Sequence, residues 1–276
     1  MESTHYKPYP NIGHSILILL ILALTGILAF PLSLAKGWIG EAPAMLLTYA
    51  ATFGIAFWIL HTIRRRVSGR TDYRFGLVHW KVPLLLALGS VALLLGVATP
   101  LMELIPLTEY TRNMIAEAAG HSGPATFVMF VLLAPLFEEL IFRGVMLDGL
   151  LRTNKPVTAI AVSSLLFGIA HFNELQLVTG LVLGTFLGWV YYRTRSVGAC
   201  IVVHLAANLS GYIMRLFVDP ETEMDLDQSL FEMWGVLPAA IAIVGSCVVF
   251  AVAVFLLKRE FDRVVPLPDE SAEKSP

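Results

Sequence analysis

Eight long apolar runs divide the sequence, and each is close to the length needed to cross a lipid bilayer. A spanning helix needs about 20 apolar residues, and inside lipid only helices or closed barrels satisfy every backbone polar group. Only 14% of the 276 residues are charged, compared with about 25% in soluble domains. We therefore predict an all-α polytopic membrane bundle of about eight helices that encloses a polar intramembrane cavity, with spans at 14–35, 43–63, 82–105, 125–147, 156–173, 175–193, 198–218 and 235–257.

The basic residues between these runs fall mostly on one side of the predicted membrane. Of the 19 lysines and arginines, fifteen lie on the side of both chain ends and one lies within a span, while three lie on the other side: Lys36, Arg112 and Arg215. Because cytoplasmic loops carry an excess of lysine and arginine, we predict that both termini are cytoplasmic. We expect a multi-pass integral membrane protein, in the cell membrane if the source is prokaryotic.

The domain organisation follows from the same pattern. One transmembrane domain is expected over 1–262, with its motif-bearing core at 125–210, and a polar, disordered cytoplasmic tail over 263–276. The fifth and sixth runs are separated only by Phe172-Asn173-Glu174, so they should form a tight hairpin. The polar linker 106–123 could hold a short surface helix.

Two adjacent carboxylates and an arginine lie inside the fourth apolar run. A charged acid at a helix centre costs roughly 2.5–3.5 kcal/mol on insertion scales, so such residues usually serve a function. On a helix, Glu139 and Arg143 share a face and can pair, whereas Glu138 points about 100° away from Glu139. One carboxylate can therefore be neutralised while Glu138 stays available for chemistry.

Two later runs each carry a histidine in an apolar surrounding. Phe167 and His171 are four residues apart, as are His204 and Asn208, so each pair shares a helical face. A carboxylate and a histidine can deprotonate a water molecule, and an asparagine with a second histidine can donate to an oxyanion. Peptide hydrolysis needs these groups. Taken singly, each also fits a packing role, as a buried ion pair or an interhelical hydrogen bond.

Taken in order, these motifs resemble those of the CAAX protease and bacteriocin-processing (CPBP) family of intramembrane proteases, in its Rce1-like and lysostaphin-resistance-like group. The resemblance implies a bundle of eight or so helices around a conical cavity open to the cytoplasm, with cleavage near the cytoplasmic membrane face. The matching motifs are Glu138-Glu139-x-x-x-Arg143, Phe167-x-x-x-His171 and His204-x-x-x-Asn208.

The resemblance also implies a role for each motif residue in a CAAX-type endopeptidase of the glutamic type. Glu138 and His171 would activate the water, while His204 and Asn208 would stabilise the oxyanion. The other motif residues would support this arrangement: Glu139, Arg143 and Phe167.

A zinc-dependent version of the same protease is an alternative. Catalytic zinc usually has three protein ligands and a water, and Glu138, His171 and His204 could supply such a set. No His-Glu-x-x-His motif is present, however, and asparagine is a poor zinc ligand. The resemblance favours a mechanism without a metal cofactor.

Two non-proteolytic functions also fit the motifs. Intramembrane glutamate and histidine sets occur in proton-coupled transporters, although no inverted halves stand out in this sequence. A membrane scaffold or immunity protein could keep the motifs as packing residues. We expect the lipid bilayer and a peptide or membrane-protein substrate as partners, and no nucleic acid; the sequence determines neither the substrate, its prenylation nor the oligomeric state.

Overall fold

The structure is a computed structural model that describes residues 7–77, 79–119, 123–217 and 228–264. Within these residues the chain forms only helices and connecting turns, which confirms the predicted all-α class. The helices are α1 (Ile12–Ser33), α2 (Lys36–Ile39), α3 (Glu41–Ser68), α4 (Lys81–Leu93), η1 (Leu94–Ala98), α5 (Thr99–Met102), α6 (Glu109–Ala119), α7 (Pro124–Phe127), η2 (Val128–Leu133), α8 (Ala134–Glu139), η3 (Leu140–Leu147), α9 (Asp148–Thr153), α10 (Pro156–Ile169), α11 (Glu174–Thr194), α12 (Val197–Leu216), α13 (Leu230–Trp234) and α14 (Val236–Val264).

Seven helical segments of the described chain are long and apolar enough to cross a membrane. The eighth predicted span corresponds to α10, which has only 14 residues. At 1.5 Å per residue it extends about 21 Å, which is shorter than the hydrocarbon core of a bilayer at about 30 Å. The integral, multi-pass architecture is therefore confirmed, and its fifth element is a short helix.

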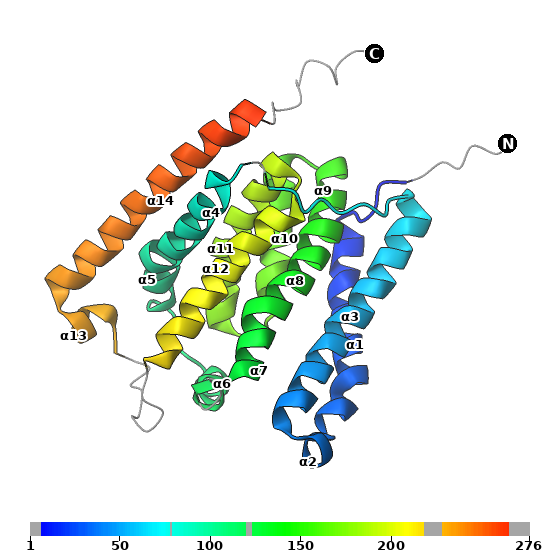
Figure 1. Cartoon of the computed structure of the whole chain (residues 1–276), viewed down its shortest axis with the longest axis horizontal. Helices are drawn as coiled ribbons and strands as arrows, with labels where there is room; N and C mark the ends of the chain where they lie inside the picture. The colour runs from blue at the N-terminus through cyan, green and yellow to red at the C-terminus, as the bar shows by residue number, and fades with distance from the viewer. Residues whose placement is uncertain (1–6, 78, 120–122, 218–227, 265–276) are drawn as a thin grey trace.

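The elements are arranged so that the two ends of the bundle differ (Figure 1). The start of α1, the end of α14 and helix α9 lie at one end, the upper end in this view. Helices α2, α6 and α13 lie at the opposite end. The upper end carries the arginine-rich segments after α3 and α9, so we call it the basic end and the other the α2 end.

Two of the long spans change from α-helical to π-helical geometry for one turn. The π-helical segment η1 precedes Pro100, and η2 precedes Pro135. Proline lacks the N–H that would continue the α-helical hydrogen-bond pattern, and a π turn re-forms the bonding around it. A third π-helical segment, η3, directly follows Glu139 and contains Arg143.

Helices α10 and α11 form the predicted tight hairpin. Their backbones touch at two glycines, because a Cβ atom at Gly180 would lie 2.6 Å from the Cα atom of Gly168. The turn ends at Asn173, whose side chain accepts a hydrogen bond from the backbone N–H of Gln176 and caps α11. The hairpin therefore holds its turn in one position beside the centre of the bundle.

Several predicted boundaries shift in the structure. Helix α10 ends at Ile169, not at residue 173, so His171 lies in the hairpin turn. The fourth span continues past residue 147 to Thr153, because the charged Asp148 is neutralised by arginines within the fold. Helix α14 includes residues 263 and 264, inside the predicted tail, and residues 265–276 lie outside the described chain. Helix α6 confirms the surface helix predicted in the linker.

Candidate active site

The fourth span brings three charged side chains into the interior of the bundle. Glu138 is the penultimate residue of α8, Glu139 ends this helix, and Arg143 follows in η3. Glu139 and Arg143 are completely buried, and Glu138 is 8% exposed. Buried charges require partners, so the contacts of these residues define what each can do.

Glu139 is held by two cationic or polar groups. The Nη1 atom of Arg143 donates to Oε1 of Glu139 at 2.9 Å, as the four-residue spacing predicts. The Nδ1 atom of His204, on α12, lies 2.7 Å from the same oxygen. Because a carboxylate only accepts hydrogen bonds, Nδ1 of His204 carries the proton, and Nε2 faces away from Glu139.

His171 is oriented by the backbone of the preceding helix, α10. Its Nδ1 atom lies 2.8 Å from the carbonyl oxygen of Phe167, one of the carbonyls left without a helical partner at the end of α10. A carbonyl is an acceptor, so Nδ1 of His171 donates and the lone pair resides on Nε2. The four-residue spacing of Phe167 and His171 thus fixes the tautomer even though His171 is outside the helix.

The two imidazoles converge on one carboxylate oxygen. The Nε2 atoms of His171 and His204 each lie 3.9 Å from Oε2 of Glu138. This oxygen is buried and has no hydrogen-bond partner among the residues that the structure describes. At 3.9 Å the groups are too far apart for a direct hydrogen bond, but two groups that each bond one water at about 2.8 Å can be separated by this distance. The sequence-based prediction that Glu138, His171 and His204 meet is confirmed.

A tyrosine that the sequence analysis did not single out contacts the same carboxylate. The hydroxyl of Tyr49, on α3, donates to Oε1 of Glu138 at 3.1 Å. Tyrosine is common in apolar helices, so the residue type alone does not indicate a functional role for Tyr49. The sequence offered one hint: a buried tyrosine hydroxyl normally has a polar hydrogen-bond partner, and Glu138 had no partner within its own helix.

The ring of Phe167 packs between the side chains of His171, His204 and Arg143. It meets the rings of His171 and His204 edge-on, with centroids 5.0 and 5.8 Å apart. The guanidinium carbon of Arg143 lies 4.5 Å from the centroid of the same ring, a favourable cation–π position. One aromatic ring therefore contacts side chains from all three motifs.

Asn208 is placed differently from its sequence-based role. One N–H of its side-chain amide donates to the carbonyl oxygen of Phe130 in η2, at 2.7 Å. This bond links α12 to a π-helical turn, where backbone carbonyls depart from the regular pattern. The other predicted site residues contact one another, whereas no hydrogen bond within the described residues joins Asn208 to Glu138 or to the two histidines.

The distances between Glu138 and the two histidines differ from those of a tetrahedral zinc site. Tetrahedral ligands at about 2.1 Å from zinc lie about 3.4 Å from one another, whereas Oε2 of Glu138 is 3.9 Å from each Nε2 atom. Within the described residues, no group of three or more histidine, cysteine, aspartate or glutamate side chains is arranged to hold a metal ion. The side chains as placed do not fit the zinc alternative. Cys200 and Cys247, the two cysteines, are free thiols.

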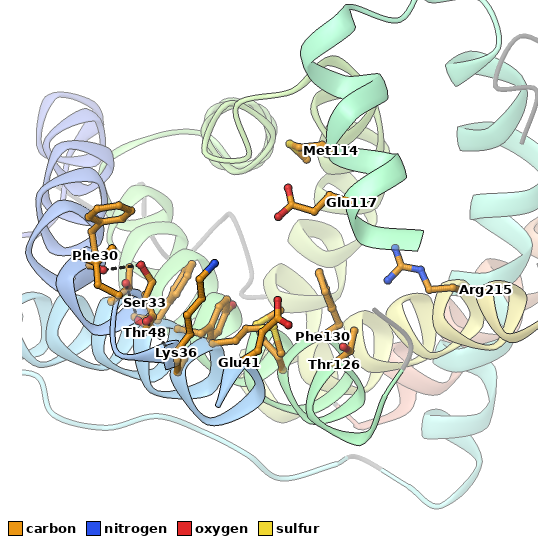
Figure 2. A pocket seen from close by; sticks show the side chains of 17 residues that line it. Phe30, Ser33, Lys36, Glu41, Thr48, Met114, Glu117, Thr126, Phe130 and Arg215 are labelled. Atoms are coloured by element: carbon orange, nitrogen blue, oxygen red, sulfur yellow. Dashed lines mark hydrogen bonds between the residues drawn. The ribbon is translucent and has the colours of Figure 1, made fainter. Parts of the chain in front are cut away.

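Two cavities lie beside Glu138 and its hydrogen-bond partner Tyr49. One, of about 640 Å³, is lined by Glu138, His171 and Phe172 together with residues of α1. The second (Figure 2), also about 640 Å³, is lined by Tyr49 and extends to Lys36 near the α2 end. Both lie between Glu138 and the α2 end. The expected opening toward the cytoplasm stays a prediction, because the membrane orientation of the bundle is itself predicted from the basic residues.

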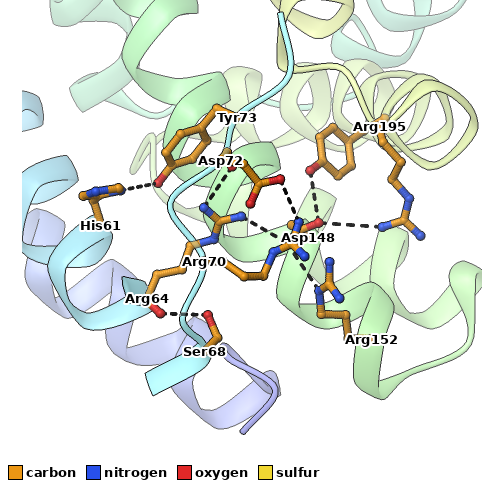
Figure 3. Close-up of polar contacts among 10 residues, drawn as sticks. His61, Arg64, Ser68, Arg70, Asp72, Tyr73, Asp148, Arg152 and Arg195 are labelled. Atoms are coloured by element: carbon orange, nitrogen blue, oxygen red, sulfur yellow. Dashed lines mark hydrogen bonds and ion pairs between the residues drawn. The ribbon is translucent and has the colours of Figure 1, made fainter. Parts of the chain in front are cut away.

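A second buried carboxylate lies at the basic end (Figure 3). Asp148 is 3% exposed and is surrounded by four arginines and a tyrosine. Arg64 is 1% exposed and pairs with Asp148 at 3.3 Å. Sequence analysis could not find this cluster, because its members come from segments far apart in the chain: Arg64, Arg70, Asp148, Arg152, Tyr191 and Arg195.

Comparison with known proteins agrees with the motifs. Residues 120–210 match the family model described as "Type II CAAX prenyl endopeptidase Rce1-like", and this segment contains every motif residue. The chain is 22% identical over 215 residues, which are 73% of this chain and 87% of the relative, to the "Putative membrane peptidase YdiL" of Bacillus subtilis (strain 168). No solved structure matches it. The family match over residues 120–210 and the similarity to a membrane peptidase together support a CAAX-type membrane endopeptidase similar to the Rce1-like family.

Proposed function

We propose that the protein is an intramembrane endopeptidase of the glutamic type, in which Glu138 is the base that activates water. The observation that carries this proposal is the unpartnered Oε2 of Glu138, which faces the Nε2 atoms of two histidines at 3.9 Å each. Oε2 of Glu139 also lacks a hydrogen-bond partner among the described residues, so the convergence of both Nε2 atoms on Glu138 is what supports Glu138 as the base.

The hydrolytic step uses the tautomers described above. A water between Glu138 and His171 loses a proton to Oε2 of Glu138, while Nε2 of His171 accepts the second water hydrogen as a hydrogen bond. The water oxygen bonds to the carbonyl carbon of the substrate. The C–N bond then breaks, and Glu138 returns its proton to the leaving nitrogen, which restores the carboxylate.

We assign to His204 the role of stabilising the oxyanion. In its imidazolium form, Nε2–H of His204 can donate to the oxygen of the tetrahedral intermediate. Glu139 accepts from Nδ1 at 2.7 Å and stabilises the positive charge on this ring. Asn208 can contribute a second donor through the amide N–H that does not bond Phe130, so we assign it the smaller share of this role.

The test is the loss of a specific cleavage. Glu138→Gln keeps the size of the side chain and its acceptor for Tyr49, but the amide cannot take a proton. We expect that protein termini produced in membranes of cells with the native chain are lost with Glu138→Gln, at equal amounts of folded protein. Cleavage that continued with Glu138→Gln would contradict the glutamic mechanism.

The metal-dependent alternative has its own measurement. We expect the purified full chain to keep its activity after exhaustive chelation, since no step above uses a metal. Activity that is lost on chelation and restored by zinc would replace the glutamic mechanism by the zinc-dependent one. The substrate class supported by the family is a peptide or membrane protein.

A further inference from the structure

The cluster around Asp148 holds more positive charge than its carboxylates can neutralise. The other two buried arginines of the described chain, Arg143 and Arg193, each pair with a single carboxylate. At the basic end, by contrast, four arginines share the carboxylate of Asp148 (Figure 3): Arg64, Arg70, Arg152 and Arg195. An ion pair that only held the fold together would need one of them.

The contacts within this cluster are long. Oδ2 of Asp148 lies 3.3 Å from both Arg64 and Arg70 and 3.5 Å from Arg152, while Oδ1 lies 3.8 Å from Arg195. Hydrogen bonds between an arginine and a carboxylate are usually about 2.7–2.9 Å. A carboxylate accepts about four hydrogen bonds, whereas each guanidinium group has five N–H donors. Asp148 therefore cannot satisfy the donors of four arginines.

The same side chains surround a small polar cavity of about 240 Å³. Among the described residues, five arginines and two aspartates line it, so its walls carry a net charge of +3. The side chains of Arg70, Arg152 and Arg195 are 32%, 37% and 34% exposed, so a ligand can reach them. Pockets for drug-sized molecules measure about 300–1,000 Å³. This cavity suits one small anionic group.

The arrangement of the arginines favours a phosphate group as this anion. Guanidinium groups match phosphate oxygens in pairs, and here they come from four segments: α3, the linker after it, α9 and the end of α11. A tetrahedral phosphate offers oxygens in several directions, whereas a carboxylate offers two in one plane. Arg195, moreover, is the C-cap of α11 with φ +52°, a position where glycine is usual. The chain has an arginine there, and its side chain points to the cluster.

We propose that the cavity beside Asp148 is a binding site for a phosphate group, whose negative charge completes the neutralisation of the arginine cluster. The group can belong to an anionic lipid, because Arg64 and Arg152 lie near the ends of two spans and Arg195 directly follows a third. It can equally belong to a soluble phosphate compound. The site is separate from Glu138, and the inference depends neither on the proposed hydrolysis nor on which membrane face the basic end occupies.

The first arm of the test uses a soluble phosphate. The purified full chain in neutral detergent is titrated with inorganic pyrophosphate at constant ionic strength, and binding is measured by calorimetry. The test variant is Arg195→Gln. Arg66→Gln is the matched control, because it removes the same charge from an exposed residue near the end of α3 that does not line the cavity. Arg74→Gln, on the exposed side of the cavity wall, takes the place of Arg195→Gln if that variant does not fold.

The second arm uses a lipid. The same variants are placed in nanodiscs of phosphatidylcholine, alone or with added phosphatidylglycerol, and their unfolding temperatures are compared. A ligand that binds the folded chain raises the unfolding temperature. If the ligand is a headgroup, we expect phosphatidylglycerol to raise this temperature in the native chain and in Arg66→Gln, and to raise it less in the cavity variant.

We expect the native chain and Arg66→Gln to bind the phosphate probe equally, and the cavity variant to bind it at least about 10-fold more weakly, as expected for the loss of a hydrogen bond between charged groups. A response to pyrophosphate alone assigns the site to a soluble phosphate compound, and a response to phosphatidylglycerol alone assigns it to a lipid. The proposal is overturned if neither probe binds. It is also overturned if Arg66→Gln weakens binding as much as the cavity variant, because the affinity would then come from general positive charge.

Discussion

The buried carboxylates of Glu138 and Asp148 lie on one long span but differ in the number and kind of their partners. Asp148 accepts from Tyr191 and pairs with four arginines, at 3.3 to 3.8 Å. Glu138 accepts one hydrogen bond, from Tyr49, and its second oxygen is left facing two imidazoles at 3.9 Å. Burial alone therefore does not distinguish the two groups; the convergence of two imidazoles on Glu138 does, and it is the reason why we propose Glu138 as the base.

The surroundings of the two groups match this difference. Asp148 joins separate segments at the basic end and lines a polar cavity of about 240 Å³, whereas Glu138 lines a cavity of about 640 Å³ whose walls are mostly apolar. We therefore expect substitutions at Asp148 to change stability and substitutions around Glu138 to change activity. Four predictions test this separation, beginning with the largest effect.

Glu138→Gln should lower the rate of cleavage by about 10²–10⁴-fold, the usual contribution of general acid–base catalysis. Its free energy of unfolding should change by less than about 1 kcal/mol, because active-site residues are often not optimised for stability. The measurement pairs cleavage assays with thermal unfolding in detergent. A large loss of stability would make Glu138 a structural group like Asp148.

Asp148→Asn should lower the free energy of unfolding by about 3–5 kcal/mol, the cost of breaking a buried ion pair by removing one partner. The buried Arg64 would lose its counter-charge. Denaturant or thermal unfolding of the purified protein measures this. The matched control is Asp72→Asn, an exposed partner of Arg70, which should cost less than about 1 kcal/mol. Equal effects of the two variants would contradict the central role of Asp148.

Tyr49→Phe should lower the cleavage rate by about 10- to 100-fold, since a hydrogen bond to a charged group contributes about 1.5–3 kcal/mol. The ring and its stacking on Phe53 are kept, so stability should change little. Phe53→Leu is a control for the packing alone. An unchanged rate with Tyr49→Phe would show that Oε1 of Glu138 needs no donor from α3.

Asn208→Ala should have the smallest effect, a decrease in rate of less than about 10-fold. Removal of a main oxyanion donor costs about 10²–10³-fold, whereas the amide of Asn208 donates to the carbonyl of Phe130. Comparison with His204→Ala under the same assay decides between the roles. A loss as large as that of His204→Ala would restore Asn208 as a principal oxyanion donor.

Local rules predicted part of the site and missed the rest for a common reason. The pair Glu139–Arg143 follows from helical spacing alone, and the meeting of Glu138 with two histidines follows from the cost of polar groups in lipid. The contacts of Tyr49, of Asn208 with Phe130, and of Arg64 with Asp148 join segments 78 or more residues apart. No spacing rule reaches that far.

The sequence by itself determined the fold class, the order of the membrane segments and the identity of the candidate catalytic groups. Long apolar runs can only be helices in lipid, and ionisable residues inside them must find partners. The tertiary structure decided how each buried carboxylate is partnered, which tautomer each histidine adopts, and where the cavities lie. These depend on packing between distant helices, because a cavity is defined by every wall around it and by no single segment.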